Sequence, residues 1–435
     1  MMKIAGRHPI YEKGTDPMRK MKINMFDLIL CLTNAADLVS PEIANHHKQV
    51  AYLAFRIGEE FGLSSEQKKD ILMAGLLHDI GAFSVRERLD LFEYEENAHE
   101  HADTGANIIR LFPPLAHIAD IIKYHHTPWN RVKETAQHQA PLSSHILHLA
   151  DRAVVMINKK QDILGQADGI CTSISSQSGE NFMPELIDAF RNVSKREYVW
   201  LDLMYASLLN IMPHVMIFDS MEMDMDGLID LTRLFAQIID FRSPFTANHS
   251  SGVAASAERL AELAGFSPNE CRMMKVAGYL HDLGKIAVMN DVLEKPGRLD
   301  EAEYSIIRSH TFYTYRTLEN IQDFETINLW ASLHHERLDG SGYPFHLTGE
   351  NIPLGSRIMA VADVFTAITE DRPYRRGMKR EDAKEVLSNM AAENALCSYV
   401  VSLMEQHFDE INAVRLSAQA QSSGDYADFI SRDKL

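Results

Sequence analysis

Two stretches of the sequence decide the fold, ILMAGLLHDIGA at residues 71–82 and MKVAGYLHDLGK at residues 274–285. Each is an apolar segment that ends in an adjacent His–Asp pair, an apolar residue and a glycine. The preceding segments also correspond, because DLILCLTNAADLVSPEIANH at 27–46 and DLTRLFAQIIDFRSPFTANH at 230–249 have the same length. The last histidine of each segment stands 32 residues before its His–Asp pair. The sequence therefore contains an internal repeat.

The repeat continues beyond the His–Asp pairs. In each half a further histidine precedes a histidine doublet by 24 residues, and an aspartate follows in a similar apolar context. The polar set of the first half is His46, His78, Asp79, His101, His125, His126 and Asp151. The polar set of the second half is His249, His281, Asp282, His310, His334, His335 and Asp363. So many matched intervals indicate that the chain arose by duplication.

Apolar residues recur at helical spacing nearly throughout, and glycine and proline gather at a few short turns. We therefore predict an all-α protein with two tandem helical-bundle domains. The predicted boundaries are 20–155 for the first domain, 156–224 for a mostly helical connector, 225–415 for the second domain and 416–435 for a polar tail. Because the tail consists mainly of small and polar residues, we expect it to be loosely ordered.

The composition excludes several classes of protein. A net charge of -18 argues against DNA or RNA polymers as partners, since proteins that bind them normally present a basic face. The sequence has no clean run of about 20 apolar residues, so we expect no membrane insertion. The four cysteines stand singly, and the N-terminus lacks the pattern of a signal peptide. We expect a cytoplasmic protein.

The polar set of the second half has the chemistry of a metal centre. Histidine and carboxylate ligands together suit divalent ions such as Fe, Mn, Zn or Ni. One group of ligands would be His249, His281 and Asp363, a second would be His310, His334 and His335, and Asp282 could bridge the two. Two such ions can activate water and neutralise a phosphodiester. A lone histidine is more often an ordinary core or surface residue, but the repeated intervals disfavour that interpretation.

Two further features follow the ligands. Lys285 could reach a phosphate as a point charge, although a lysine at a helix C-terminus is also favoured by the helix dipole. The segment HHERLDGSGYPFHLTGENIPLGSRI at 334–358 places glycines and Pro344 directly after the histidine doublet. Such a loop allows close approach of a ligand to the backbone, and Tyr343 offers a phenol or a stacking face. An ordinary turn is the alternative.

These residues resemble the HD-GYP family of the HD phosphohydrolase superfamily. The matching motifs are HDLGK at 281–285, HHERLDGSGYP at 334–344, RIMAVADVFTAIT at 357–369 and DRPYR at 371–375. The resemblance implies tandem HD-type helical bundles. It also implies hydrolysis of cyclic di-GMP or 3′3′-cyclic GMP-AMP to the linear 5′-phosphorylated dinucleotide, by an HD-GYP domain at 225–415.

The resemblance also implies roles for residues. All seven polar residues of the second half would bind two divalent ions, Fe or Mn first, with Ni, Zn, Mg and Ca left open. Asp282 and Lys285 would be catalytic, with Lys285 on the substrate phosphate or the attacking water. Further substrate contacts would come from Gly342, Tyr343, Pro344, Arg372 and Arg375.

Three positions depart from the family pattern. Members with a third metal have a glutamate four residues before the first histidine, where this sequence has Phe245. We therefore expect two metals. Thr366 replaces a common aspartate and Thr311 a common proline, and neither change is expected to abolish activity.

The first half resembles a degenerate HD domain. It keeps all seven polar residues, so metal binding stays open, but Ala82 stands where the second half has its lysine. The segment HHTPWNRV at 125–132 also lacks the Gly-Tyr-Pro sequence found at 342–344 in the second half, in the segment after the doublet that we call the GYP loop. We expect a regulatory, dimerising or structural role.

Three functions stay open on the sequence alone. The first is a cyclic dinucleotide phosphodiesterase. The second is a non-catalytic cyclic-dinucleotide-binding signalling module, and the third is another HD-type nucleotide phosphohydrolase, which would lack the GYP loop. The sequence does not distinguish cyclic di-GMP from cyclic GMP-AMP. The expected partner is the dinucleotide itself, and the resemblance also allows a homodimer and a GGDEF-type or other signalling partner.

Overall fold

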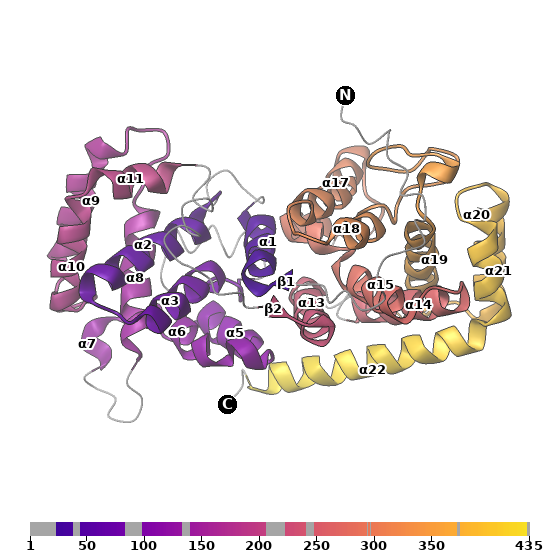
Figure 1. Cartoon of the computed structure of the whole chain (residues 1–435), viewed down its shortest axis with the longest axis horizontal. Coiled ribbons are helices and arrows are strands. Elements are labelled where there is room, and N and C mark those ends of the chain that lie inside the picture. Colours follow the sequence, from indigo (N-terminus) through magenta and orange to yellow (C-terminus); the bar gives the residue numbers. More distant parts are fainter. Residues whose placement is uncertain are drawn as a thin grey trace.

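The computed structural model describes residues 23–37, 44–82, 98–132, 140–205, 222–240, 248–293, 295, 297–371 and 375–432. In this part of the chain nearly all regular structure is helical, which confirms the predicted all-α class. Every helix among these residues is too short or too polar to cross a lipid bilayer. The helices form two lobes that lie side by side (Figure 1).

The N-terminal lobe contains the first group of elements. They are β1 (Ile23–Asn24), α1 (Met25–Asp37), α2 (His46–Phe61), α3 (Ser65–Leu77), α5 (Ala98–Arg110), η1 (Pro113–Ile118), α6 (Ala119–Lys123), α7 (Trp129–Val132), α8 (Leu142–Val155), α9 (Leu164–Ser176), α10 (Pro184–Ser194) and α11 (Glu197–Met204).

The C-terminal lobe contains the second group. They are β2 (Glu222–Met223), α13 (Met225–Asp240), α14 (His249–Leu263), α15 (Pro268–Leu280), η2 (Leu283–Ala287), α16 (Asn290–Leu293), α17 (Glu301–Leu318), α18 (Glu325–Ser332), η3 (Gly349–Asn351), α19 (Leu354–Thr369), α20 (Arg380–Ala392), α21 (Ser398–Gln406) and α22 (Phe408–Arg432).

The helix before each His–Asp pair is built in the same way. Ser64 before α3 and Ser267 before α15 both form capping boxes with the side chain three positions later, which satisfies helix N–H groups at both starts. A Cβ on Gly278 would lie 2.5 Å from the Cα of Ala254, so only glycine lets α15 lie this close to α14. Gly75 has the same relation to α2. The two His–Asp pairs therefore leave their helices from equivalent positions.

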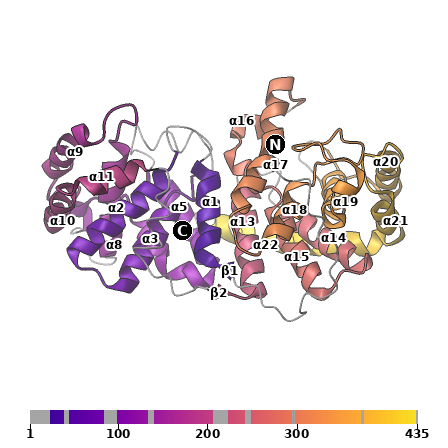
Figure 2. The ribbon, with the colours of Figure 1, turned by 45° about the horizontal axis from the view of Figure 1, so that its top comes forward.

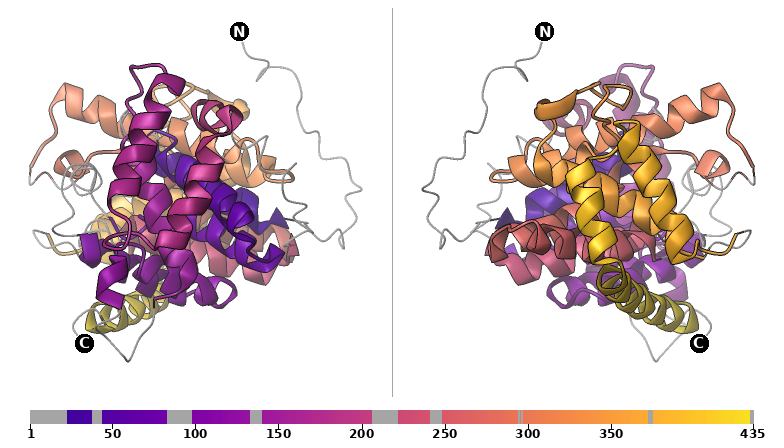
Figure 3. Two further views of the ribbon diagram at one scale, coloured as in Figure 1. Left: turned by 90° about the vertical axis from the view of Figure 1, so that its left-hand side faces the viewer. Right: turned by 90° about the vertical axis from the view of Figure 1, so that its right-hand side faces the viewer.

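Residues 156–205 of the connector predicted at 156–224 belong to the N-terminal lobe, whereas β2 near its end begins the C-terminal lobe. Helices α9, α10 and α11 pack on α2 and α8 and form the outer face of this lobe (Figure 3). Phe190 and Trp200 are buried there, and Gln49 of α2 donates a hydrogen bond to the carbonyl of Leu203 at 2.7 Å. Residues 206–221 lie outside the described residues.

The expectation of a loosely ordered tail after Arg415 was wrong. Helix α22 continues to Arg432, packs along α14 and reaches α5 of the other lobe (Figure 1). The Asn248 side-chain amide donates a hydrogen bond to Ser423 Oγ at 2.7 Å. Alanine and glutamine in this segment favour a helix, and its contacts are polar. The segment after Arg415 therefore lacks the apolar periodicity from which a helix is predicted in a sequence.

The lobes meet through α1. This helix packs against η2 and α17 of the C-terminal lobe, and it lies at the junction of the two lobes in Figure 2. The thiol of Cys31 donates a hydrogen bond to the carbonyl of Thr317 at 3.0 Å. Strands β1 and β2, which precede the equivalent helices α1 and α13, pair antiparallel with Ile23 opposite Met223. The two copies of the repeat thus join at equivalent elements.

Candidate metal centre

The seven polar residues predicted in the second half of the chain converge inside the C-terminal lobe. His249 begins α14, His281 and Asp282 follow α15, His310 lies in α17, His334 and His335 follow α18, and Asp363 lies in α19. Six of them are buried. His335 differs because its side chain keeps 31% of its accessible surface. The cluster is therefore buried except on the side of His335.

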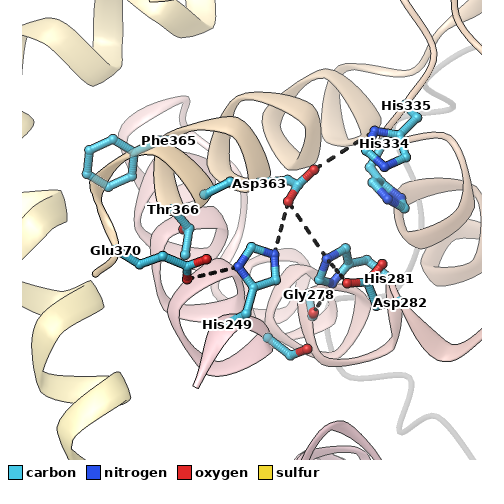
Figure 4. Close-up of polar contacts among 12 residues, drawn as sticks. His249, Gly278, His281, Asp282, His334, His335, Asp363, Phe365, Thr366 and Glu370 are labelled. Atoms are coloured by element: carbon cyan, nitrogen blue, oxygen red, sulfur yellow. Dashed lines mark hydrogen bonds and ion pairs between the residues drawn. The ribbon is translucent and has the colours of Figure 1, made fainter. Parts of the chain in front are cut away.

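One group of ligand atoms surrounds a single carboxylate oxygen. His249 Nε2 lies 3.1 Å from Asp363 Oδ1, and His281 Nε2 lies 4.0 Å from the same oxygen (Figure 4). Ligand atoms of these three residues lie within 4.8 Å of one another. They form the first of the two groups predicted from the sequence.

The second group lies beside the first. His310 Nε2 is 3.5 Å from His334 Nε2, and these two residues and His335 again bring ligand atoms within 4.8 Å of one another. Asp282 stands between the groups, since its Oδ2 lies 3.2 Å from His281 Nε2 and its Oδ1 lies 3.4 Å from His310 Nε2. A carboxylate in this position can ligate two ions at once.

The imidazole rings are fixed by their second nitrogens. In three of them Nδ1 bonds the backbone carbonyl three residues earlier: His281 to Gly278 at 2.8 Å, His310 to Ile307 at 2.5 Å and His334 to Ala331 at 2.7 Å. His249 is the first residue of α14 and instead places Nδ1 3.1 Å from Glu370 Oε2 (Figure 4). All four rings therefore turn Nε2 toward the shared centre, as metal-ligating histidines do.

The protonation states of Asp282 and His310 fit a divalent cation. Burial opposes ionisation of Asp282, but His281 and Lys285 outweigh it and hold the pKa of this carboxyl well below its usual value. Burial lowers the pKa of His310 to about 3, so this imidazole is neutral near neutral pH. Ionised carboxylates and neutral imidazoles are the forms that bind metal. The Nε2 of His281 and the Oδ1 of Asp282 are also buried without a well-formed hydrogen bond, as expected of ligand atoms.

Lys285 lies against the centre from η2. Its Nζ donates a hydrogen bond to Asp282 Oδ2 at 2.6 Å. Burial disfavours its charge, but the carboxylate of Asp282 raises the pKa of Lys285 above its ordinary value. The ammonium is therefore a permanent positive charge at the edge of the cluster.

The GYP loop is anchored by a buried glutamate. Glu336 follows the histidine doublet and accepts hydrogen bonds from the backbone N–H of Phe345 at 2.7 Å and of Leu347 at 2.9 Å. Gly342 lies so close to this turn that a Cβ there would be 2.3 Å from the nitrogen of Arg337. The loop is thus folded back over the residues that bear the ligands.

This fold places Tyr343 over the exposed edge of the cluster. Its ring packs on the ring of His335 with centroids 4.9 Å apart, and the Arg308 guanidinium lies 5.0 Å from the same tyrosine ring. Pro344 follows through a cis peptide bond. An aromatic face and a cation therefore border the only side chain of the cluster, among the described residues, that is substantially exposed.

Of the remaining positions singled out in the sequence, the structure describes Arg375. Arg375 is exposed and donates a hydrogen bond to the carbonyl of Ala367 at 2.7 Å. Arg372 and Phe245 lie outside the described residues, so the expectations attached to them stay expectations.

Three acidic residues at the centre escaped the sequence reasoning. Glu370 holds His249, and Glu336 holds the GYP loop. Asp240 accepts hydrogen bonds from the N–H and hydroxyl of Ser250 at the start of α14, and burial raises its pKa to about 7. Asp240 had a signal in the repeat, because Asp37 occupies the matching position in the first half. Glu370 and Glu336 had none, since the first half has Asn158 and Thr127 at the matching positions.

The seven polar residues of the first half also converge. All seven are buried, and ligand atoms of six of them form two groups that share Asp79. The seventh, Asp151, places its Oδ1 3.2 Å from His46 Nε2. Each half of the chain therefore contains one His–Asp cluster.

Comparison with known proteins agrees with this architecture. The profile of the HD domain matches residues 43–156, and a second profile, also of the HD domain, matches residues 233–396. Fold and ligand set together define a tandem HD-domain protein of the metal-dependent phosphohydrolase class.

Similar proteins of known activity show to which family within this class the chain belongs. The chain is 30% identical to the 3′3′-cGAMP-specific phosphodiesterase 1 of Vibrio cholerae over 397 residues, which cover 88% of this chain and 91% of that protein. It is 42% identical over 155 residues to the cyclic di-GMP phosphodiesterase response regulator RpfG of Xanthomonas campestris, covering 35% of this chain and 41% of the relative. The chain belongs to the HD-domain family of cyclic dinucleotide phosphodiesterases, which confirms the resemblance noted in its motifs.

A solved structure supports the fold alone. The crystal structure of a cyclic GMP-AMP specific phosphodiesterase of V. cholerae superimposes with a TM-score of 0.63 at 24% identity. The match covers 92% of this chain and 98% of that protein. The two-lobed arrangement is therefore shared over almost the whole length.

Proposed function

We propose that the C-terminal lobe hydrolyses a 3′,5′-cyclic dinucleotide, either cyclic di-GMP or 3′3′-cyclic GMP-AMP, to the linear 5′-phosphorylated dinucleotide. One observation carries this proposal. Seven metal-ligating side chains meet beside Lys285, and the cluster reaches solvent at His335, directly below the Tyr343 ring.

The residues fit two divalent ions. His249, His281 and Asp363 would hold one, His310, His334 and His335 would hold the other, and Asp282 lies between the two groups. When bound, the ions supply an activated water as nucleophile and neutralise charge on the phosphodiester. A histidine-rich set with few carboxylates suits Fe, Ni or Zn better than Mg or Ca, which prefer oxygen ligands. The resemblance to the HD-GYP family places Fe and Mn first.

The chain itself supplies position and charge. The ammonium of Lys285 is held by Asp282 at 2.6 Å and stands where it can bond a phosphate oxygen as negative charge grows in the transition state. Such preorganised charge in a partly buried site accelerates reactions because it needs no reorganisation during the chemical step. Lys285 is therefore assigned to the substrate phosphate.

The reaction opens the ring at one phosphodiester. A water oxygen joins the phosphorus, the bond from phosphorus to the 3′-oxygen breaks, and the 3′-oxygen takes up a proton. The phosphate stays on the 5′-oxygen, so the product is linear and 5′-phosphorylated.

The edge of the site suits a nucleotide base or phosphate. Tyr343 is partly exposed at the mouth, and the Arg308 guanidinium lies over its ring. An aromatic face can stack on a base, whereas the arginine can pair with phosphate. Gly342 and Pro344 fix this tyrosine, as the resemblance implies for the GYP loop.

The relatives bear on the choice of dinucleotide. Two proteins that match most of the chain, at 30% and 26% identity, are 3′3′-cGAMP-specific phosphodiesterases of V. cholerae. The cyclic di-GMP phosphodiesterases match only a part of about 170 residues or less. Shared two-lobe architecture therefore supports 3′3′-cyclic GMP-AMP as the substrate to test first.

The test uses the full chain loaded with Mn(II) or Fe(II) and each dinucleotide separately, with linear product followed by chromatography. We expect turnover by the wild type. His281→Ala combined with Asp282→Ala should abolish it, because both groups of ligands lose a member.

The matched control alters the other lobe. His78→Ala combined with Asp79→Ala removes the equivalent pair and should leave at least part of the activity. If the wild type cleaved neither dinucleotide with either metal, the chain would instead be a binding module or a hydrolase of other nucleotides.

A further inference from the structure

The cluster in the N-terminal lobe repeats the ligand geometry of the catalytic one. His78 Nε2 lies 3.2 Å from Asp79 Oδ2, while His101 Nε2 lies 3.3 Å from Asp79 Oδ1. His46 Nε2 lies 3.2 Å from Asp151 Oδ1. Asp79 thus stands between two groups of histidines, as Asp282 does in the other lobe.

The groups are as tightly drawn together as those of the C-terminal lobe. Ligand atoms within 4.8 Å of one another come from His46, His78 and Asp79 in one group and from Asp79, His101, His125 and His126 in the other. All of these residues are buried. The second group contains four potential ligands, which is more than any group among the described residues of the C-terminal lobe contains.

The rings also turn the same nitrogen toward the centre. His78 places Nδ1 2.9 Å from the carbonyl of Gly75, and His125 places Nδ1 2.6 Å from that of Ile122. Their Nε2 atoms, and that of His126, are buried without a well-formed hydrogen bond. Buried polar atoms are normally satisfied, and atoms that converge on one point from several elements are satisfied together by a cation.

Two features distinguish this cluster from the C-terminal one and argue against hydrolysis. Ala82 occupies the position of Lys285, so no ammonium faces the centre from that position. Arg152 donates to Asp151 Oδ2 through Nη2 at 2.6 Å and through Nε at 3.1 Å. This carboxylate oxygen is therefore engaged by the chain, whereas the matching oxygen of Asp363 faces His335 at 4.0 Å.

The cluster is also covered where the catalytic one is exposed. His126 keeps only 6% of its surface, against 31% for the side chain of the equivalent His335. The residues that follow the doublet are tied to the connector, since the N–H of Trp129 donates to the carbonyl of Asn181 at 3.1 Å. Phe182 of the same connector loop packs on His148, with ring centroids 5.2 Å apart. His148 in turn packs on His126, at 6.0 Å.

We propose that the N-terminal lobe binds divalent metal at the cluster around Asp79, as a closed and non-hydrolytic centre. The metal holds together α2, α3, α5, α6 and α8, and the connector covers it. The duplicated site has thus kept its ligands and lost access to substrate.

The experiment counts metal in the full-length His281→Ala/Asp282→Ala variant. This variant leaves the N-terminal cluster untouched and lacks the catalytic pair. After loading with Mn(II) and removal of free metal, mass spectrometry should find at least about one manganese per chain, and adding His101→Ala should remove it. A folded double variant, verified by circular dichroism, that retained no manganese would overturn the proposal.

The closed character has its own measurement. When wild-type protein is mixed with EDTA, manganese should leave in a fast phase that removes activity and a slow phase that does not. The slow phase should persist in the His281→Ala/Asp282→Ala variant and vanish in the single variant His101→Ala, while the fast phase remains in His101→Ala. Loss of all manganese in one fast phase would contradict a closed centre. The metal count does not depend on turnover, so it stands apart from the proposed phosphodiesterase activity.

Discussion

At the scale of single residues, the two halves differ most clearly at Lys285 and Ala82. Both positions follow a buried His–Asp pair and a glycine. Only Lys285 adds a charge, and its bond to Asp282 holds that charge beside the centre. We therefore attribute the proposed difference in activity between the two clusters largely to this residue and to the loop that borders the C-terminal site.

We predict that Lys285→Met lowers kcat by about 100-fold, the effect of losing one preorganised charge from a transition state. Bound manganese should be unchanged, because Lys285 is not a ligand. Steady-state kinetics and metal analysis check both. Lys275→Met is the matched control, since Lys275 pairs with Glu258 on the surface of α15. A kcat equal to that of the control would remove Lys285 from the mechanism.

Glu370 accepts the hydrogen bond from Nδ1 of His249, a role that a backbone carbonyl fills for other histidines of the centre. Three other rings of the centre, those of His281, His310 and His334, bond a carbonyl three residues earlier, but His249 begins its helix. Glu370→Gln should weaken metal binding by about 10- to 100-fold, as loss of an orienting carboxylate does. Activity titrated with Mn(II) measures this as a higher half-activating concentration. Exposed Glu381→Gln should leave the titration unchanged, and equal curves for both variants would refute the role of Glu370.

The sequence predicted ligands better than their supports. Equal intervals in the two halves marked all seven candidate ligands of each cluster, because a metal site needs its ligands at fixed positions on fixed helices. Glu370, Glu336 and Arg152 have no such signal. Glu370 acts through a contact between helices that are distant in the sequence, Glu336 through the folding of one loop, and Arg152 through its neighbour Asp151. None of these contacts repeats between the halves, so spacing alone could not have identified them.

At the scale of elements, α22 connects the end of the chain to the centre. Gln419 Nε2 lies 3.5 Å from Glu370 Oε2, and a Cβ on Gly252 of α14 would lie 2.9 Å from this glutamine. The helix therefore covers α14, whose first residue is His249, and also contacts the glutamate that orients it.

Ending the chain after Arg415 should destabilise the C-terminal lobe by roughly 2 kcal/mol or more, because α14 loses its cover. It should also raise the Mn(II) concentration needed for activity. Thermal unfolding and metal titration measure the two effects. Ending the chain after Arg432 is the control, since it keeps the helix. A shortened protein that matched the control in both would mean that the tail is dispensable.

Helix content was predictable, but the surfaces that join helices were not. Apolar periodicity indicated the helices of both lobes. The placement of α9, α10 and α11 on the N-terminal lobe depends on contacts such as Gln49 with Leu203. No pattern within those helices reveals which partner they cover.

At the scale of the whole molecule, the two lobes are copies joined at equivalent elements. Helix α1 of the N-terminal lobe packs on η2, the element that carries Lys285 (Figure 2). One cluster of buried apolar side chains extends through both lobes, and it includes Ile23 of the first lobe and Ile411 of the second. The repeat predicted two domains, but it could not show that α1 of the first lobe packs on η2 of the second.

The identity of the product tests the central claim most directly. The wild-type protein is loaded with Mn(II) or Fe(II) and incubated with 3′3′-cyclic GMP-AMP, and in parallel with cyclic di-GMP, in water enriched in oxygen-18. Mass spectrometry should find a linear dinucleotide with one heavy oxygen in its 5′-terminal phosphate. Recovery of only unlabelled cyclic dinucleotide, with metal shown to be bound in the C-terminal lobe, would contradict the account.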